Sequence, residues 1–307
     1  MPKTTHHFFL TVPIVTISFL LTACSFNNMV FQAERVPPTV KEMKIKTPAD
    51  TIVVHLAKND SQIIITKSNG DTLDLKYTIE NVFFKSSNGD TLNGWFLKPK
   101  NQTATVTLLH LHGNGGFLLS HLQTISPLIK TGFQIFMFDY SGYGFSQGEA
   151  ARKNVLTDAL SALDYIRSRK EVKNTNLVIY GQSLGGHYAA VVATRRQSDI
   201  DGLVLEGAFT SYKAMAEHMI PVLGYIFMKQ GYHADKMIKG FHKPLLVIHS
   251  LQDKIVPFKM GKKIFNNANA PKEFFKSQKC HICGPKYYTD EISEKIKNML
   301  TGNYKLY

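Results

Sequence analysis

The chain has 307 residues, of which 44% are hydrophobic, and a formal net charge of +13. This length is enough to bury one large hydrophobic core. The positive charge suggests a nucleic acid or an anionic membrane surface as a partner, but the basic residues are dispersed and form no stripe with interleaved aromatic residues. We therefore expect no nucleic acid binding.

The first 23 residues have the pattern of a signal peptide, in which a basic start precedes a short apolar centre and small residues. Lys3 is the only charged residue of this segment, and residues 8–21 are mostly apolar. A membrane-spanning helix would need about 20 apolar residues, and Pro13 would interrupt it. The ending Leu-Thr-Ala-Cys24 resembles the lipoprotein box of bacteria, which implies cleavage before Cys24 and lipidation of this cysteine.

We therefore expect an exported protein that lipid chains anchor to a bacterial membrane, outer or cytoplasmic, on its periplasmic or extracellular side. Cleavage removes Lys3 and no acidic residue, so the net charge falls from +13 to +12. Each well-placed basic residue contributes about 1 kcal/mol of attraction to anionic headgroups, which favours a position close to the membrane surface.

Two segments precede the main domain. Residues 24–50 contain three prolines, mixed charge and weak periodicity, which is typical of a tether. Residues 51–76 hold two apolar runs that predict strands of an N-terminal β extension. The string Ser-Asn-Gly-Asp-Thr-Leu occurs at 68–73 and again at 87–92, and Asn-Gly between apolar runs predicts a β-hairpin at each site.

Residues 77–304 are predicted to form one domain in which strands and helices alternate. Apolar runs predict strands near residues 105–111, 133–138, 176–181, 202–206, 244–249 and 273–277. Helical patterns occur near residues 117–130, 152–169, 184–196 and 288–300. The alternation predicts an α/β fold with a mostly parallel central sheet of about eight strands and helices on both faces. An insert over residues 210–240 is predicted to form a short helical cap.

A glycine-rich loop, His112-Gly-Asn-Gly-Gly116, follows the first strand of this series. In folds of this type such a loop supplies a backbone N–H that binds an oxyanion. Asn114 is the predicted donor, with its neighbours on either side as alternatives. A flexible connection between strand and helix is the other interpretation of the loop.

The segment Gly181-Gln-Ser-Leu-Gly-Gly186 lies between an apolar strand and a run of small residues. A strand, Gly-x-Ser-x-Gly and a helix form the nucleophile elbow of serine hydrolases, in which a sharp turn exposes the Ser hydroxyl. Ser183 is therefore the predicted nucleophile. The N–H of Leu184, at the helix N-terminus, is a predicted oxyanion donor. The alternative is a glycine-rich turn in which Ser183 only caps the helix.

An acid and a base follow the serine in the order that this arrangement requires. Asp253 lies just past one strand and His281 follows the last one, so both lie at the edge where parallel strands end. His281 would take the proton of Ser183, and Asp253 would accept a hydrogen bond from the other ring nitrogen.

Other residues of the same types are weaker candidates. His249 lies inside a strand, and His187 lies in the first turn of a helix, which favours His281 as the base. Asp139 ends another strand and is the rival acid, although a role in holding the next loop by hydrogen bonds fits it better.

Two cysteines, Cys280 and Cys283, flank the predicted base. In an oxidising compartment they can form a disulfide that stiffens the loop of His281, and two free thiols are the alternative. The pair lacks further ligands for zinc, and Gly284 stands where haem attachment needs a histidine. We expect no metal and no organic cofactor.

Five segments together resemble the α/β-hydrolase superfamily, in particular the serine aminopeptidase-like branch that also includes protein depalmitoylases. The resemblance covers about residues 77–300 and rests on His112–Gly116, Phe138–Gly148, Gly181–Gly186, Leu205–Ser211 and His249–Pro257. It implies the α/β-hydrolase fold, a triad of Ser183, Asp253 and His281, and an oxyanion hole formed by Asn114 and Leu184.

These features predict a monomeric, membrane-tethered serine hydrolase that cleaves a carboxylic ester or thioester of a lipid-like acid through an acyl-enzyme. The methionine and aromatic residues of the cap would suit the lining of an acyl-chain pocket, and a helical pair packed on the sheet edge is the alternative. A serine aminopeptidase is a second hypothesis, in which Glu206 or Glu217 binds the substrate ammonium. A non-catalytic envelope binding protein on the same fold is a third.

Overall fold

The computed structural model describes residues 31–46, 50–56, 62–222, 224, 226, 228–229 and 231–303. The expected signal peptide over residues 1–23 and the expected lipidation of Cys24 lie outside these residues. Among the residues described, no helix has the length and apolar character needed to cross a membrane.

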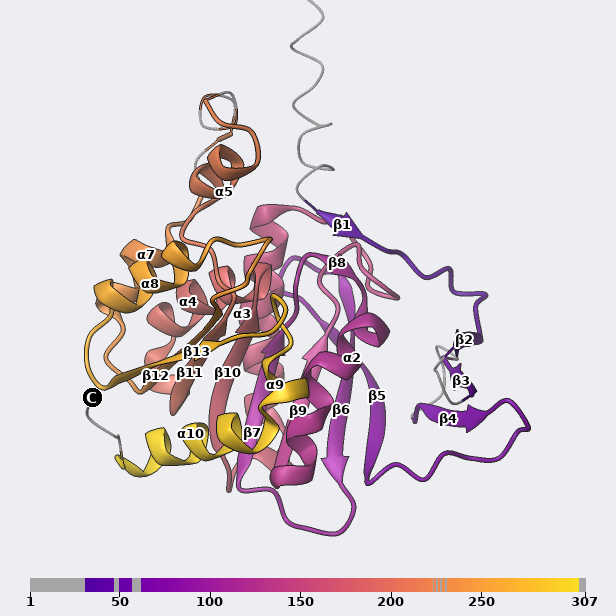
Figure 1. Cartoon of the computed structure of the whole chain (residues 1–307). Helices are drawn as coiled ribbons and strands as arrows, with labels where there is room; N and C mark the ends of the chain where they lie inside the picture. Colours follow the sequence, from indigo (N-terminus) through magenta and orange to yellow (C-terminus); the bar gives the residue numbers. More distant parts are fainter. Residues whose placement is uncertain are drawn as a thin grey trace, which may run out of the picture.

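The centre of the molecule is an eight-stranded sheet with the order β13-β12-β11-β10-β7-β9-β6-β5. All neighbours from β13 to β9 pair in parallel, whereas β6 pairs antiparallel with β9 and with β5. The prediction of a mostly parallel sheet of about eight strands is therefore confirmed (Figure 1). The strands are β5 Tyr77–Lys85, β6 Thr91–Pro99, β7 Val106–Leu111, β9 Phe133–Phe138, β10 Asn176–Gln182, β11 Gly202–Glu206, β12 Leu245–Ser250 and β13 Lys272–Ser277.

Helices cover both faces of this sheet, as the alternation of the sequence predicted. They are α2 Leu118–Ile125, α3 Arg152–Ser168, α4 Leu184–Arg195, α5 Tyr212–Met219, α7 Ala234–Met237, α8 Phe258–Asn267, α9 Gly284–Tyr287 and α10 Thr289–Thr301. Figure 1 shows α2 and α10 on one face and α3 and α4 on the other. Successive residues of a strand point to opposite faces, so Leu109 packs in the core under α3 and α4, and Leu108 packs in the core under α2 and α10.

The N-terminal region is more structured than the sequence predicted. The tether expected over residues 24–50 is wrong from residue 31 onward, because β1 Gln32–Ala33 pairs with β8 Gly115–Gly116 and β2 Glu42–Lys46 pairs with β3 Thr51–His55. Apolar and charged residues alternate in β2, which is the pattern of a half-buried strand. Strand β4 Ile64–Lys67 completes this small antiparallel sheet.

The two Asn-Gly strings both reverse the chain. Gly89 has a φ of 96° in the turn that joins β5 to β6, so the predicted second hairpin is confirmed. Gly70 has a φ of 89° in the first turn, but only the single bridge between Thr66 and Thr72 extends beyond it, and β4 pairs mainly with β3. The predicted turn is therefore present there without a full hairpin.

Candidate active site

The turn between β10 and α4 holds Ser183 in a backbone conformation that residues other than glycine rarely adopt. Ser183 has φ 54° and ψ −113°, and its N–H bonds to the carbonyl of Glu206 on the neighbouring strand at 2.8 Å. A Cβ at Gly185 would overlap the carbonyl of Leu111, and one at Gly181 would collide with Ala189. Glycine at both positions therefore lets α4 lie close to the sheet while the Ser183 side chain faces outward into a cavity.

The structure brings Ser183, His281 and Asp253 together although they are far apart in the sequence. His281 Nε2 lies 2.8 Å from Ser183 Oγ, and His281 Nδ1 lies 2.6 Å from Asp253 Oδ2. The Asp253 side chain is fully buried, and that of His281 is 11% exposed. In this arrangement the imidazole can take a proton from the hydroxyl while the carboxylate holds the ring and balances its charge.

Several donors hold the carboxylate of Asp253. The backbone N–H groups of Ile255 and Val256 each bond to Oδ1 at 2.9 Å, and His249 Nε2 lies 3.3 Å from Oδ2. Burial alone would raise the pKa of Asp253, but the hydrogen bonds from His249 and His281 outweigh it and lower this pKa well below its ordinary value. Asp253 therefore stays ionised, which is the form that an imidazolium partner requires.

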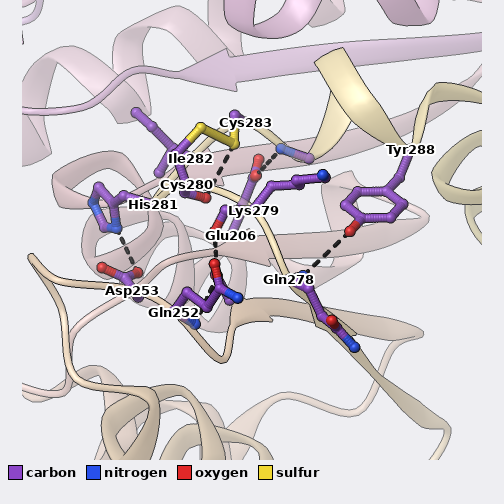
Figure 2. Close-up of a disulfide and its surroundings, with 12 residues drawn as sticks. Glu206, Gln252, Asp253, Gln278, Lys279, Cys280, His281, Ile282, Cys283 and Tyr288 are labelled. Carbon is purple, nitrogen blue, oxygen red and sulfur yellow. Dashed lines mark hydrogen bonds and ion pairs between the residues drawn. A yellow bond between two sulfur atoms is a disulfide. The ribbon is translucent and has the colours of Figure 1, made fainter.

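A disulfide and two hydrogen bonds hold the loop that carries His281 (Figure 2). A disulfide joins Cys280 to Cys283, so the cysteine pair is oxidised as the first of the two interpretations expected. Ser250 Oγ donates a hydrogen bond to the carbonyl of Lys279, which ties this loop to the end of β12. The Glu206 carboxylate accepts the N–H of Gly284 at 2.6 Å.

The side chain of Glu206 is buried and hydrogen-bonded inside the protein, so it does not face a substrate. Its side chain also accepts hydrogen bonds from Tyr180 at 2.9 Å and from Gln182 at 2.8 Å, and the residue is only 1% exposed. Burial raises the pKa of Glu206, and the three donors oppose this rise. The hypothesis that Glu206 binds a substrate ammonium is therefore wrong, because its oxygens are already occupied.

The predicted oxyanion donors lie beside Ser183. Asn114 and Leu184 line the same cavity as Ser183, and a Cβ at Gly113 would lie 3.7 Å from Ser183 Cβ. Tyr143 donates to the backbone carbonyl of Asn114 at 2.9 Å, which fixes the glycine-rich loop. The backbone of this loop therefore passes within reach of a carbonyl oxygen on Ser183.

The weaker candidates have other partners. Asp139 is fully buried and accepts the N–H of Leu118 at 2.9 Å, so its side chain holds the start of α2, an earlier element, where the alternative interpretation expected the loop after residue 139. His187 stacks on the ring of Phe209 with 4.5 Å between ring centroids. Among the described residues, no cluster of three or more His, Cys, Asp or Glu side chains could hold a metal ion.

A cavity of about 880 Å³ opens above Ser183 and His281. Its cap side is apolar and is formed by Phe209, Tyr212, Met215, Met219, Ile220 and Met228. The methionine and aromatic residues of the cap therefore do line a pocket, as the first interpretation of the insert predicted. No Asp or Glu is present among the described residues that line this cavity.

Comparisons with known proteins agree with this fold. A family model described as serine aminopeptidase, S33, matches residues 102–237. The uncharacterized protein YfhR from Salmonella typhi is 37% identical over 210 residues, which cover 63% of this chain and 71% of that protein. Lysophosphatidylserine lipase ABHD12 from Xenopus tropicalis is 28% identical over 211 residues, covering 62% of this chain and 54% of that protein.

Solved structures give the same result at the level of the fold. The esterase Pf2001 from Pyrococcus furiosus superposes with a TM-score of 0.61 at 16% identity, over 74% of this chain and 93% of the esterase. Est1E from Butyrivibrio proteoclasticus, solved with ferulic acid, gives 0.58 at 17% identity, over 72% and 98% of the two chains. The sheet order, the strained serine turn and the similarity to YfhR together show that the chain belongs to the α/β-hydrolase superfamily.

Proposed function

We propose that the protein is a serine hydrolase that cleaves a carboxylic ester or thioester of a lipid-like acid through an acyl-enzyme. The observation that carries this proposal is the hydrogen-bonded series Ser183–His281–Asp253 at the inner end of a largely apolar cavity. The esterases and the lipase among the similar proteins support the same class of reaction.

In the first half of the reaction, Ser183 Oγ attacks the carbonyl carbon while His281 Nε2 takes the hydroxyl proton. The developing oxyanion accepts hydrogen bonds from the backbone N–H groups of Leu184 and of Asn114 or its neighbour. His281 then gives the proton to the leaving alkoxide or thiolate. In the second half, His281 takes a proton from water, the hydroxide attacks the acyl-enzyme, and the proton returns to Ser183 as the free acid leaves.

The lining of the cavity favours an ester over a peptide N-terminus. An aminopeptidase needs a carboxylate near the scissile bond to bind the substrate ammonium. The described lining contains no acidic residue, and Glu217 is exposed on α5 outside it. We also propose that the chain is exported and lipid-anchored at Cys24, because its first 24 residues have the pattern of a lipoprotein leader.

A fluorophosphonate probe tests the proposed nucleophile, because it labels only an activated serine. The native chain should be labelled, Ser183→Ala should lose labelling, and its hydrolysis of p-nitrophenyl esters should fall by about 1000-fold or more. Ser120→Ala is the matched control, since Ser120 lines the same cavity and should leave labelling intact. A folded native chain that resists the probe would favour the non-catalytic binding protein. Faster cleavage of aminoacyl anilides than of esters would favour the peptidase.

A further inference from the structure

Exposed apolar side chains surround the mouth of the cavity. Met219, Ile220 and Ile255 line the cavity and are also exposed to solvent by 68%, 43% and 55%. Val222 and Ile226 continue the apolar surface along the cap and are 68% and 63% exposed. Of these residues Met219 ends α5, which projects from the body in Figure 1. Large apolar residues that gather around one opening indicate a surface that meets an apolar partner.

The same mouth is positively charged. Lys254 and Lys286 line the cavity and are exposed, and the ion pairs between lysines and carboxylates within the described residues involve other lysines. The described residues that line the cavity also include no Asp or Glu, so no carboxylate in this lining balances the positive charge of the two lysines at the opening. We call Met219, Ile220, Ile255, Lys254 and Lys286 the rim. Apolar side chains between lysines match the surface of a membrane that contains anionic lipid.

The chain enters the described structure beside this rim. Gln32 lines the cavity, and β1 pairs with the glycine-rich strand β8 next to the loop of Asn114. Figure 1 shows β1 and α5 at the same end of the molecule. Cys24 precedes Phe31 by seven residues, which span at most about 25 Å when fully extended. An anchor at Cys24 would therefore hold Phe31, next to the cavity-lining Gln32, within about 25 Å of the bilayer.

We propose that the rim docks on an anionic membrane surface, so that acyl substrates enter the cavity from the bilayer. This inference rests on the proposed acyl substrate, but its test reads insertion into lipid and does not depend on hydrolysis. A second copy of the chain or another protein on the rim would give a different result in the same test.

The test places a tryptophan at the rim in the full-length chain reconstituted in vesicles of phosphatidylglycerol with brominated acyl chains. Trp95 is the only tryptophan of the chain and is 1% exposed, so its emission provides a constant background. Met219→Trp should add emission that the brominated lipid quenches and that shifts to the blue. Ile64→Trp is the matched control, because Ile64 is 48% exposed on β4, away from the rim, and its replacement should remain unquenched.

The electrostatic part is tested in the Met219→Trp chain by Lys254→Gln with Lys286→Gln. The ratio of docked to undocked rim on phosphatidylglycerol should fall about fivefold for each lysine lost. Lys170→Gln with Lys173→Gln, two exposed lysines near the start of β10, should change it little. Equal quenching at positions 219 and 64, or equal effects of the two lysine pairs, would overturn the proposal. A blue shift that grows with protein concentration without vesicles would show that a second copy covers the rim. Absence of ester hydrolysis, by contrast, would refute only the proposed function.

Discussion

Glu206 connects the turn of Ser183, the proposed nucleophile, to the loop of His281, the proposed base. Its backbone carbonyl accepts the N–H of Ser183 at 2.8 Å, and its side chain accepts the N–H of Gly284, three residues after His281. Gln182, which precedes the nucleophile, bonds both to Glu206 and to the carbonyl of Ile282. A displacement of about 1 Å between reacting groups can lower a rate by about 100-fold, so these bonds bear directly on the reaction.

We predict that Glu206→Gln lowers kcat for a soluble short ester by about 10- to 100-fold with little change in KM. The amide keeps the shape but offers only one acceptor oxygen to the three donors, so the His281 loop loses part of its support. Initial rates over a range of ester concentrations give kcat and KM separately. Asp158→Asn is the control, because this buried carboxylate bonds Ser86 and Ser141 at 2.7 Å each, away from the site, and should affect stability more than kcat. A wild-type kcat in Glu206→Gln would show that Glu206 does not position the base.

Individual residues were predictable to different degrees. The chain order of Ser183, Asp253 and His281 selected three side chains that do lie within hydrogen-bond distance. The role of Glu206 was not predictable, because a sequence does not show that a carboxylate already has three donors. The support from His249 was missed for the same reason, although its position four residues before Asp253 at the end of a strand was a usable signal.

At the level of elements, the start of α4 carries a histidine that the fold keeps neutral. His187 is fully buried, Nδ1 lies 3.2 Å from the carbonyl of Phe209, and Nε2 has no hydrogen-bond partner among the described residues. Burial lowers the pKa of His187 to about 4. The unfolded chain, with an ordinary histidine pKa of about 6.5, therefore binds a proton at a pH where the folded chain does not.

This difference predicts that the free energy of unfolding decreases as pH falls from about 6.5 to 4. His187 alone should contribute about 2 kcal/mol to the loss between pH 7 and pH 5. In His187→Phe, the difference in unfolding free energy between these two pH values should shrink by that amount, as measured by urea titration. If the variant and the native chain lose the same stability on acidification, His187 is not kept neutral by the fold.

The elements themselves were predicted best where they are buried on both faces. The parallel strands appear within one residue of their predicted positions, and all but β13 are short apolar runs that are buried along nearly their whole length. The edge strand β13 is only partly buried and was recognised from Phe274 and Phe275. Helix α8 was missed, since only Met260, Gly261 and Ile264 of its ten residues are buried and lysines separate them. The parallel pairing of β12 and β13 requires a crossover connection between them, which is usually a helix. The topology therefore predicts a helix between these two strands, although the composition of the segment does not.

At the scale of the whole molecule, the small sheet β2–β3–β4 is part of the main core. Val54 and Leu56 are 0% and 1% exposed and belong to the same buried cluster as Trp95 and Leu97 of the central sheet. These residues were predicted to form a separate extension, because the strand pattern involves only neighbouring residues. Their packing against the central sheet involves residues that are far apart in the sequence, and the strand pattern does not show it.

Leu56→Ala is therefore expected to destabilise the entire molecule by about 2–5 kcal/mol in a single cooperative transition. Differential scanning calorimetry measures both the shift and the number of transitions. Ile64→Ala, at an exposed position of the same small sheet, should change stability by no more than about 0.5 kcal/mol. A new low-temperature transition in Leu56→Ala would mean that the small sheet unfolds independently.

The bond between Cys280 and Cys283 makes the redox history of a preparation part of its chemistry. Dithiothreitol or mercaptoethanol in a purification buffer would open the four-residue ring that contains His281, and chain made in a reducing cytoplasm would never have closed it. Two samples of identical sequence can thus be two different covalent species in the loop of His281, the proposed base. Turnover numbers for this protein are comparable only when the thiol content of each sample has been measured.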